Sequence, residues 1–251
     1  MSEIKIPRLR TVDKVKPSFS LNQFPPDFGF KLGKEIVYLL ATKSTPDLVG
    51  PEWEQIFASC IGAAWKPSNV GLDDVILGVC AWGAKTVKNP HPHQAKIIRL
   101  ISGRSSPAYS YGQMELDADP QEMGNSVLSI WNARVESLRV KFSHLRTVVL
   151  IKSGDLTELT VFEFETVLYP VDQYFWSRNK RGNLEGFDKT TAVHLFTWQP
   201  HGSQFTIIEP VSQDCLLITL KSPPKLDKDS VLKALNYDDS WVTVIRRNGG
   251  I

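Results

Sequence analysis

This 251-residue sequence lacks several features that define common protein classes. It has three widely spaced cysteines, Cys60, Cys80 and Cys215, and no CxxC pair, so neither a disulfide framework nor a structural zinc site is indicated. No stretch approaches the roughly 18 apolar residues of a membrane-spanning helix, and the N-terminus lacks the apolar core of a secretory signal. These absences favour a reduced, cytoplasmic protein without a membrane partner.

Two motifs of nucleotide and acyl chemistry are also missing. There is no GxxxxGK[ST] phosphate loop and no GxSxG nucleophile elbow, so neither a nucleotide cofactor nor a serine hydrolase is indicated. The net charge of +2 neither requires nor excludes nucleic acid, because a binding cleft needs only a local basic lining. With 42% hydrophobic and 22% charged residues, the composition is that of a folded protein.

Hydrophobic periodicity predicts an α/β (α+β) protein with a central mixed β-sheet flanked by helices. Residues 1–33, rich in proline and basic groups, are expected to form an irregular arm. The expected helices are 33–41, 51–65 and 124–144, the last capped by Asn125 or Ser126. The expected strands are 75–79, 80–87, 96–102, 147–152 and 158–165, followed by 192–197, 204–208, 215–220 and 241–246.

One acidic residue and one lysine stand out within the apolar stretch GLDDVILGVCAWGAKTVK, residues 71–88. A turn near Gly78 would bring Asp74 and Lys85 to the same end of two adjacent strands. Carboxylates on adjacent strands hold Mg²⁺, and a neighbouring lysine can activate water and stabilise charge on a reacting phosphate. The alternative is an ordinary strand-end aspartate and a surface lysine.

The pattern resembles the PD-(D/E)XK nuclease superfamily, and its type II restriction endonucleases in particular. Leu72-Asp73-Asp74-Val75-Ile76 stands where that family has Pro-Asp and hydrophobic residues, and Gly83-Ala84-Lys85 stands at the tripeptide. The order of a leading helix, two active-site strands, a long helix and the strand TVVLIK is also similar. The resemblance implies a restriction-endonuclease-like core at 51–165, a β-rich recognition part at 166–251, and Mg²⁺-dependent hydrolysis of double-stranded DNA.

The tripeptide departs from the family at Gly83, where an acidic residue is expected. A replacement carboxylate could come from Glu52 or Glu54 on the preceding helix, or from Asp73. Glu54 is favoured. The resemblance therefore implies Asp74, Lys85 and Glu54 as catalytic residues, with Asp74, Glu54, Glu52 and Asp73 as metal ligands.

Two polar segments could contact DNA. The first follows the third strand, and the second, residues 173–206, interleaves basic and amide side chains that pair with guanine and adenine edges. Ordinary surface loops are the alternative for both. The candidate contacts are Arg104, Ser105, Ser106, Tyr109, Arg178, Asn179, Lys180, Arg181, Asn183, Gln199, His201, Ser203 and Gln204.

A palindromic target would imply a homodimer, since protein symmetry mirrors DNA symmetry. Because Gly83 removes one carboxylate, the alternative function is a non-catalytic DNA-binding protein on the same fold. The remaining polar candidates are histidines: His91 and His93 are expected in a solvent-exposed turn, and His144 at a helix C-terminus.

Overall fold

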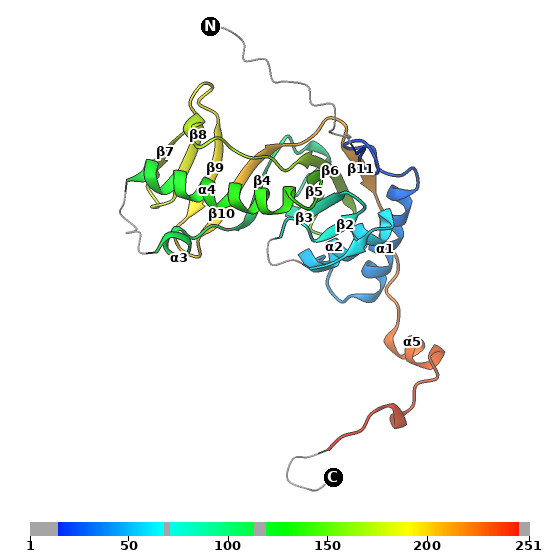
Figure 1. The fold of residues 1–251 in the computed structure, drawn as a ribbon. Coiled ribbons are helices and arrows are strands. Elements are labelled where there is room, and N and C mark those ends of the chain that lie inside the picture. The colour runs from blue at the N-terminus through cyan, green and yellow to red at the C-terminus, as the bar shows by residue number, and fades with distance from the viewer. Residues whose placement is uncertain (1–14, 68–70, 113–118, 246–251) are drawn as a thin grey trace.

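The computed structural model describes residues 15–67, 71–112 and 119–245, which form a mixed α/β structure with two β-sheets (Figure 1). Sheet A has the order β1 (Ala64–Trp65), β2 (Val75–Leu77), β3 (Cys80–Lys88), β5 (His144–Lys152), β6 (Glu158–Glu165) and β11 (Leu216–Thr219). Sheet B has the order β4 (Ile97–Arg104), β10 (Gln204–Pro210), β9 (His194–Gln199), β8 (Leu184–Asp188) and β7 (Tyr174–Arg178).

The strand pairing confirms a mixed β-sheet, but the strands form two sheets where one was predicted. Within sheet A, β3 and β5 are parallel and the other pairs are antiparallel, whereas sheet B is antiparallel throughout. The expected third strand of the core, β4, pairs with β10 in sheet B instead. Conversely, β11 belongs to sheet A, so the division at residue 166 does not follow the sheets.

The two faces of sheet A are covered by different elements. Helices α1 (Phe28–Thr42) and α2 (Gly50–Ile61) pack on one face. The other face contacts β4 through a cluster that includes Leu100 and Val149. The long helix α4 (Pro120–Arg139) extends from sheet B to sheet A, and its apolar side chains pack against both (Figure 1).

Helix α1 begins at Phe28, so the expectation of an irregular arm through residue 33 is wrong for its last residues; residues 1–14 of that arm lie outside the described part. Two glycines of this helix lie close to β11 and to the residue that follows it. A Cβ at Gly29 would lie 3.5 Å from Leu216, and one at Gly33 would lie 3.4 Å from Leu220. Close helix–strand packing therefore outweighs their low helix propensity.

Helix α4 is shifted toward the N-terminus relative to the prediction. Asp119, rather than Asn125 or Ser126, is the N-cap, and its side chain accepts hydrogen bonds from the backbone N–H groups of residues 121 and 122. The helix ends at Arg139, so His144 is not a helix C-terminal residue. It opens β5, and its Nε2 lies 2.8 Å from the carbonyl oxygen of Val15.

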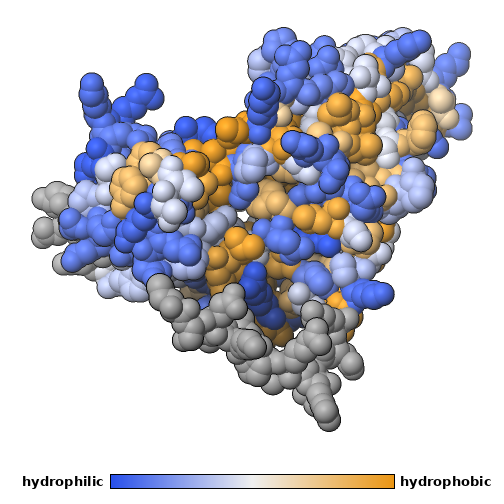
Figure 2. All heavy atoms as spheres, turned by 90° about the horizontal axis from the view of Figure 1, so that it is seen from above, coloured by the Kyte–Doolittle hydropathy of each residue, from blue (hydrophilic) through white to orange (hydrophobic). Residues whose placement is uncertain are grey.

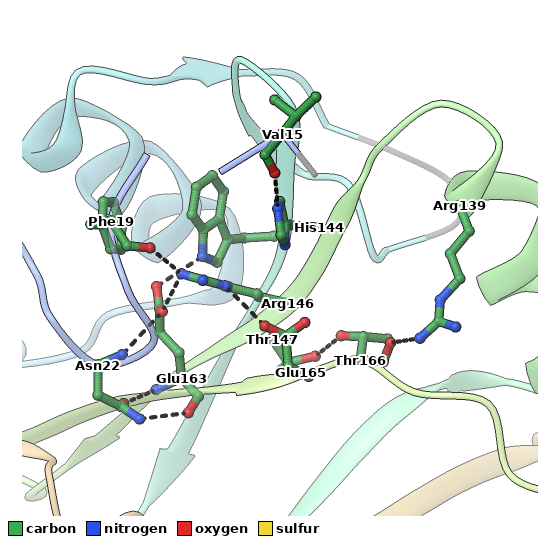
Figure 3. Close-up of polar contacts among 11 residues, drawn as sticks. Val15, Phe19, Asn22, Arg139, His144, Arg146, Thr147, Glu163, Glu165 and Thr166 are labelled. Atoms are coloured by element: carbon green, nitrogen blue, oxygen red, sulfur yellow. Dashed lines mark hydrogen bonds and ion pairs between the residues drawn. The ribbon is translucent and has the colours of Figure 1, made fainter. Parts of the chain in front are cut away.

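A buried ion pair fixes the segment before α1 to sheet A (Figure 3). Arg146 on β5 and Glu163 on β6 are almost fully enclosed, with Nη1 and Oε2 3.0 Å apart. Trp82 donates its indole N–H to Glu163 at 2.9 Å, Arg146 donates to the carbonyl of Phe19 at 3.1 Å, and Asn22 accepts from the Glu163 N–H at 2.6 Å. Strands β3, β5 and β6 are thereby joined to residues 19–22.

The C-terminal residues differ from the prediction of a strand at 241–246. Helix α5 (Lys228–Ala234) and a 3-10 turn at Asp239–Trp241 are followed by residues 242–245 without secondary structure, and Arg246 lies outside the described residues. Nowhere in the described ranges is a helix both long and apolar enough to cross a bilayer.

Candidate functional site

The β2–β3 hairpin brings Asp74 and Lys85 to the same end, as the sequence predicts. Gly78 takes the left-handed conformation (φ 57°) that the tight turn requires, and Val75 pairs with Trp82 across the hairpin. The Lys85 Nζ lies 4.0 Å from Oδ2 of Asp74.

Most of this pair is enclosed. Asp74 is 3% exposed to solvent, and the side chain of Lys85 is 22% exposed. Burial lowers the pKa of Lys85, the negative charges of Asp74 and Glu54 oppose that change, and Arg134 reinforces it. The site therefore combines a buried carboxylate with an amine that loses its proton more readily than a free lysine.

Arg134 on α4 is a member of this site that the sequence analysis missed. Burial lowers its pKa, and Asp74 opposes that change. Its Nη1 donates to the carbonyl of Ser102 at 2.9 Å. The guanidinium occupies the space beside Gly103, where a Cβ would lie 2.8 Å from Nη2. A basic residue three positions after Trp131, at the edge of the apolar helix face, is the only signal in the sequence.

The acidic residue missing from the tripeptide is excluded by local packing. A Cβ at Gly83 would lie 2.9 Å from the carbonyl oxygen of Gly71 and 3.1 Å from Cα of Leu72. The same Gly71 oxygen accepts a hydrogen bond from Lys85 at 2.9 Å. The segment at 71–72 thus lies directly over Gly83 and holds the lysine.

Of the two glutamates considered as replacements, only Glu54 acts on the site electrostatically. Its Oε2 accepts a hydrogen bond from the indole N–H of Trp65 at 3.1 Å. Its negative charge partly offsets the lowering of the Lys85 pKa by burial. Glu52 instead accepts from the backbone N–H of Val49 at 3.0 Å and forms an ion pair with Lys43. The bond to Val49 satisfies a backbone N–H group at the start of α2, which accounts for the position of Glu52 without a metal.

Asp73 is the third candidate ligand. Its Oδ1 is buried and has no hydrogen-bond partner among the described residues, and a buried carboxylate oxygen of this kind favours a bound cation or donor. In the described ranges, however, no three acidic, histidine or cysteine side chains form a cluster that could hold a metal by themselves.

The two predicted DNA-contacting segments lie at one end of sheet B. Arg104 pairs with Gln204, and Gln204 pairs with Gln199, so the ends of β4, β9 and β10 coincide. Leu184 pairs with Trp198, which places the β7–β8 turn at this end as well. The short helix α3 (Pro107–Tyr111) follows β4 there, with Tyr109 91% exposed.

A polar hollow of about 550 Å³ lies beside this end of sheet B. It lies on the face turned away from α4, because its strand residues alternate with the buried Leu184 and Trp198. Its lining residues are Arg99, Asn179, Lys180, Arg181, Asn183, Glu185, Thr197 and Gln199. Five of these were predicted DNA contacts; Arg99, Glu185 and Thr197 were not.

Some predicted contacts have structural roles. Ser105 is fully buried, and its carbonyl accepts from the indole of Trp198 at 2.7 Å, so its side chain is not available to a phosphate. Ser106 caps α3 through the N–H of Tyr109. Asn179 organises the β7–β8 turn by accepting from the N–H of Arg181 at 2.9 Å.

The remaining predicted contacts lie in the two turns or, for Arg178, at the end of the adjoining strand β7. Arg178 donates to the carbonyl of Gly182, and Lys180 is exposed beside it. In the β9–β10 turn, His201 is exposed, whereas the carbonyl of Ser203 accepts from the N–H of residue 105 at 2.8 Å.

The histidines of the NPHPH segment do not both lie in an exposed turn. His91 is exposed, but the Nε2 of His93 lies 3.2 Å from each of the carbonyl oxygens of Leu159 and Ile218. His93 thus links the 3-10 turn at Pro92–Gln94 to strands β6 and β11.

Comparison with known proteins yields no relative of this chain: no protein-family model, curated protein or solved structure matches it.

Proposed function

We propose that the protein is a Mg²⁺-dependent, sequence-specific endonuclease of double-stranded DNA, similar to type II restriction enzymes of the PD-(D/E)XK superfamily. The observation that carries the proposal is the enclosed Asp74–Lys85 pair at one end of the β2–β3 hairpin. The surrounding elements support it: α2 precedes the hairpin, α4 follows it, and β5 pairs in parallel with β3.

The carboxylates fit a cation that keeps several ligands from water and substrate. Mg²⁺ is commonly bound through one or two protein carboxylates together with waters and phosphate oxygens. Asp74 and the buried Oδ1 of Asp73 supply such a pair, and Glu54 is the alternative second carboxylate. When bound, the ion would act as a Lewis acid on the scissile phosphate.

Lys85 and Arg134 supply the remaining chemistry of the proposed reaction. The lowered pKa of Lys85 increases the fraction of its amine that is unprotonated and therefore able to accept a proton from the attacking water. The guanidinium of Arg134 can stabilise negative charge that develops on the phosphate oxygens. Since Arg134 also bonds the carbonyl of Ser102 on β4, it links this site to the end of sheet B.

That end of sheet B is the proposed DNA-reading surface. Arg104, Lys180 and Arg181 would neutralise phosphates, and the amide groups of Asn183 and Gln199 would contact base edges. A homodimer would present two such surfaces to a palindromic site.

The test is digestion of plasmid DNA with Mg²⁺ or with EDTA, followed by sequencing of the fragment ends. Asp74→Asn and Lys85→Met should abolish cleavage while each variant remains folded at the assay temperature and keeps its DNA binding. Lys88→Met is the matched control, because Lys88 lies on the same strand but is exposed; it should cut normally. Cleavage that survives both site substitutions would rule out the assigned site.

A non-catalytic DNA-binding protein is the second candidate, and the packing at Gly83 favours it. The close contact with Gly71 leaves no room for the usual acidic residue, and no three potential ligands cluster in the described residues. A mobility shift of plasmid fragments without any Mg²⁺-dependent cutting would identify this function.

A further inference from the structure

The C-terminal arm, defined as residues 227–245, carries a series of exposed apolar side chains. Helix α5 and the turn after it stand clear of the two sheets (Figure 1), and none of their residues is buried. The exposed apolar side chains of the arm are Val231, Leu235, Tyr237, Trp241, Val242, Val244 and Ile245. An isolated helix of seven residues is not stable in water by itself, so the arm requires a partner surface.

A groove of matching chemistry lies between α1 and β11, with a volume of about 1080 Å³. Its α1 wall includes Phe30 and Tyr38, which are 80% and 67% exposed, and its β11 wall includes Leu217, which is 51% exposed. In the space-filling view, apolar side chains are exposed among polar ones from the centre of the molecule to its upper right (Figure 2). An apolar surface of this kind marks an interaction site.

One wall of the groove is also an open sheet edge. Among the described strands, β11 pairs only with β6, at the end of sheet A. An unpaired edge accepts an added strand. Residues 241–245, WVTVI, have the β-branched composition of a strand but no strand to pair with, and Val242 is already extended (φ −120°, ψ 120°).

The attachment of the arm directs it away from its own groove. The N–H of Leu226 donates to the carbonyl of Ala41 at 2.9 Å, and Lys225 donates to the carbonyls of Leu40 and Lys43, both at 2.6 Å. These bonds fix the chain at the C-terminal end of α1, at the rim of the groove, and α5 then points away from the body (Figure 1). A second copy of the chain is therefore the partner that this geometry fits.

We propose that the C-terminal arm of one copy docks in the α1–β11 groove of a second copy, and that the exchange is reciprocal. Each copy contributes the same arm and the same groove, so the contact closes as a two-fold dimer. The α5 residues Val231 and Leu235 lie on one helix face and pack on the α1 wall, and residues 241–245 add to the edge of β11. The proposed dimer does not depend on the nuclease reaction, so its test measures association and not cleavage.

Native Cys215 lines the groove and permits a direct test of this arrangement. In the full-length Ser240→Cys variant, mild oxidation with diamide should give a disulfide-linked dimer on non-reducing gels. The same variant carrying Cys215→Ser should give none. A monomer with an internal disulfide would show that the arm folds back on its own chain, and a dimer that persists without Cys215 would show arm–arm contact; either result overturns the proposal.

Light scattering after size-exclusion chromatography provides the second measurement. The wild-type chain should be a dimer, and Leu217→Asp should raise the dissociation constant at least about tenfold, which corresponds to roughly 1.4 kcal/mol. Ile101→Asp is the matched control, because Ile101 is 54% exposed on sheet B and should leave the dimer intact. A monomeric wild-type protein, or equal dissociation constants for the two variants, would refute the docking site.

Discussion

Replacing Gly83 with alanine tests the packing that excludes a carboxylate from the tripeptide. The added Cβ would lie 2.9 Å from the Gly71 carbonyl oxygen and 3.1 Å from Cα of Leu72. Both contacts involve backbone atoms, so no side-chain rotation can relieve them. Because β3 is held between β2 and β5, the segment at 71–72 must move.

The expected cost follows from two opposing contributions. Overpacking of this kind costs about 1–3 kcal/mol, whereas replacing a strand glycine by alanine recovers roughly 0.5–1 kcal/mol of backbone entropy. We therefore expect Gly83→Ala to lower the free energy of unfolding by about 1–2 kcal/mol. At roughly 2–4 °C per kcal/mol for a chain of this size, the Tm should fall by about 2–8 °C.

Thermal and urea unfolding, followed by circular dichroism, measure this change. Gly50→Ala is the control, since nothing lies within 4 Å of a Cβ at Gly50; its Tm should stay constant or rise slightly. Equal Tm values for the two variants would refute the close contact. In that case an acidic side chain could be accommodated at Gly83, and local packing would no longer explain its absence.

Three further substitutions test other parts of the fold. Gly124→Ala should lower stability by more than 2 kcal/mol, because its Cβ would lie 2.1 Å from the ring of Trp176; urea unfolding measures this. Glu163→Gln should cost about 3 kcal/mol by leaving a buried arginine charge without its closest partner, measured in the same way. Burial raises the pKa of Glu209 to about 7, despite the Tyr169 hydroxyl that donates to it at 3.4 Å. The folded state therefore binds this proton more tightly than the unfolded state, and stability should fall as pH rises from about 4.5 to 7. Glu209→Gln should remove that part of the pH dependence of the Tm; an unchanged profile would contradict it.

The hairpin that carries Asp74 and Lys85 could be predicted because its signals are local. Two short apolar runs, a glycine at the turn and a polar residue at each end determine which side chains meet. Neither Arg134 nor the close contact over Gly83 could be predicted in this way. Arg134 depends on the packing of α4 against β4, two segments that are separate in the chain. The contact over Gly83 depends on how residues 71–72 fold back across β3, which the apolar pattern does not specify.

The errors in the predicted elements have similar causes. The prolines and basic residues before α1 made its first turns resemble part of an irregular arm, although the helix begins at Phe28 and packs closely against β11. Strand β4 was assigned correctly as a strand but placed in the wrong sheet, since periodicity does not determine the pairing partner. At residues 241–245 the strand pattern is present, but the described chain has no strand beside it.

Arg134 lies between the two parts of the proposed nuclease, the DNA-reading end of sheet B and the Asp74–Lys85 site. Its guanidinium contacts the carbonyl of Ser102 at the end of β4, and its charge interacts with Asp74 beside β2. The end of sheet B proposed to read DNA and the site proposed to cut it are therefore connected through one side chain. If DNA binding displaces β4, the charge beside Asp74 and Lys85 must change with it. Arg134→Met should consequently reduce cleavage at the correct sequence more than it reduces DNA affinity, which separate measurements of cleavage rate and binding would reveal. Equal losses in both would mean that Arg134 contributes only to DNA affinity.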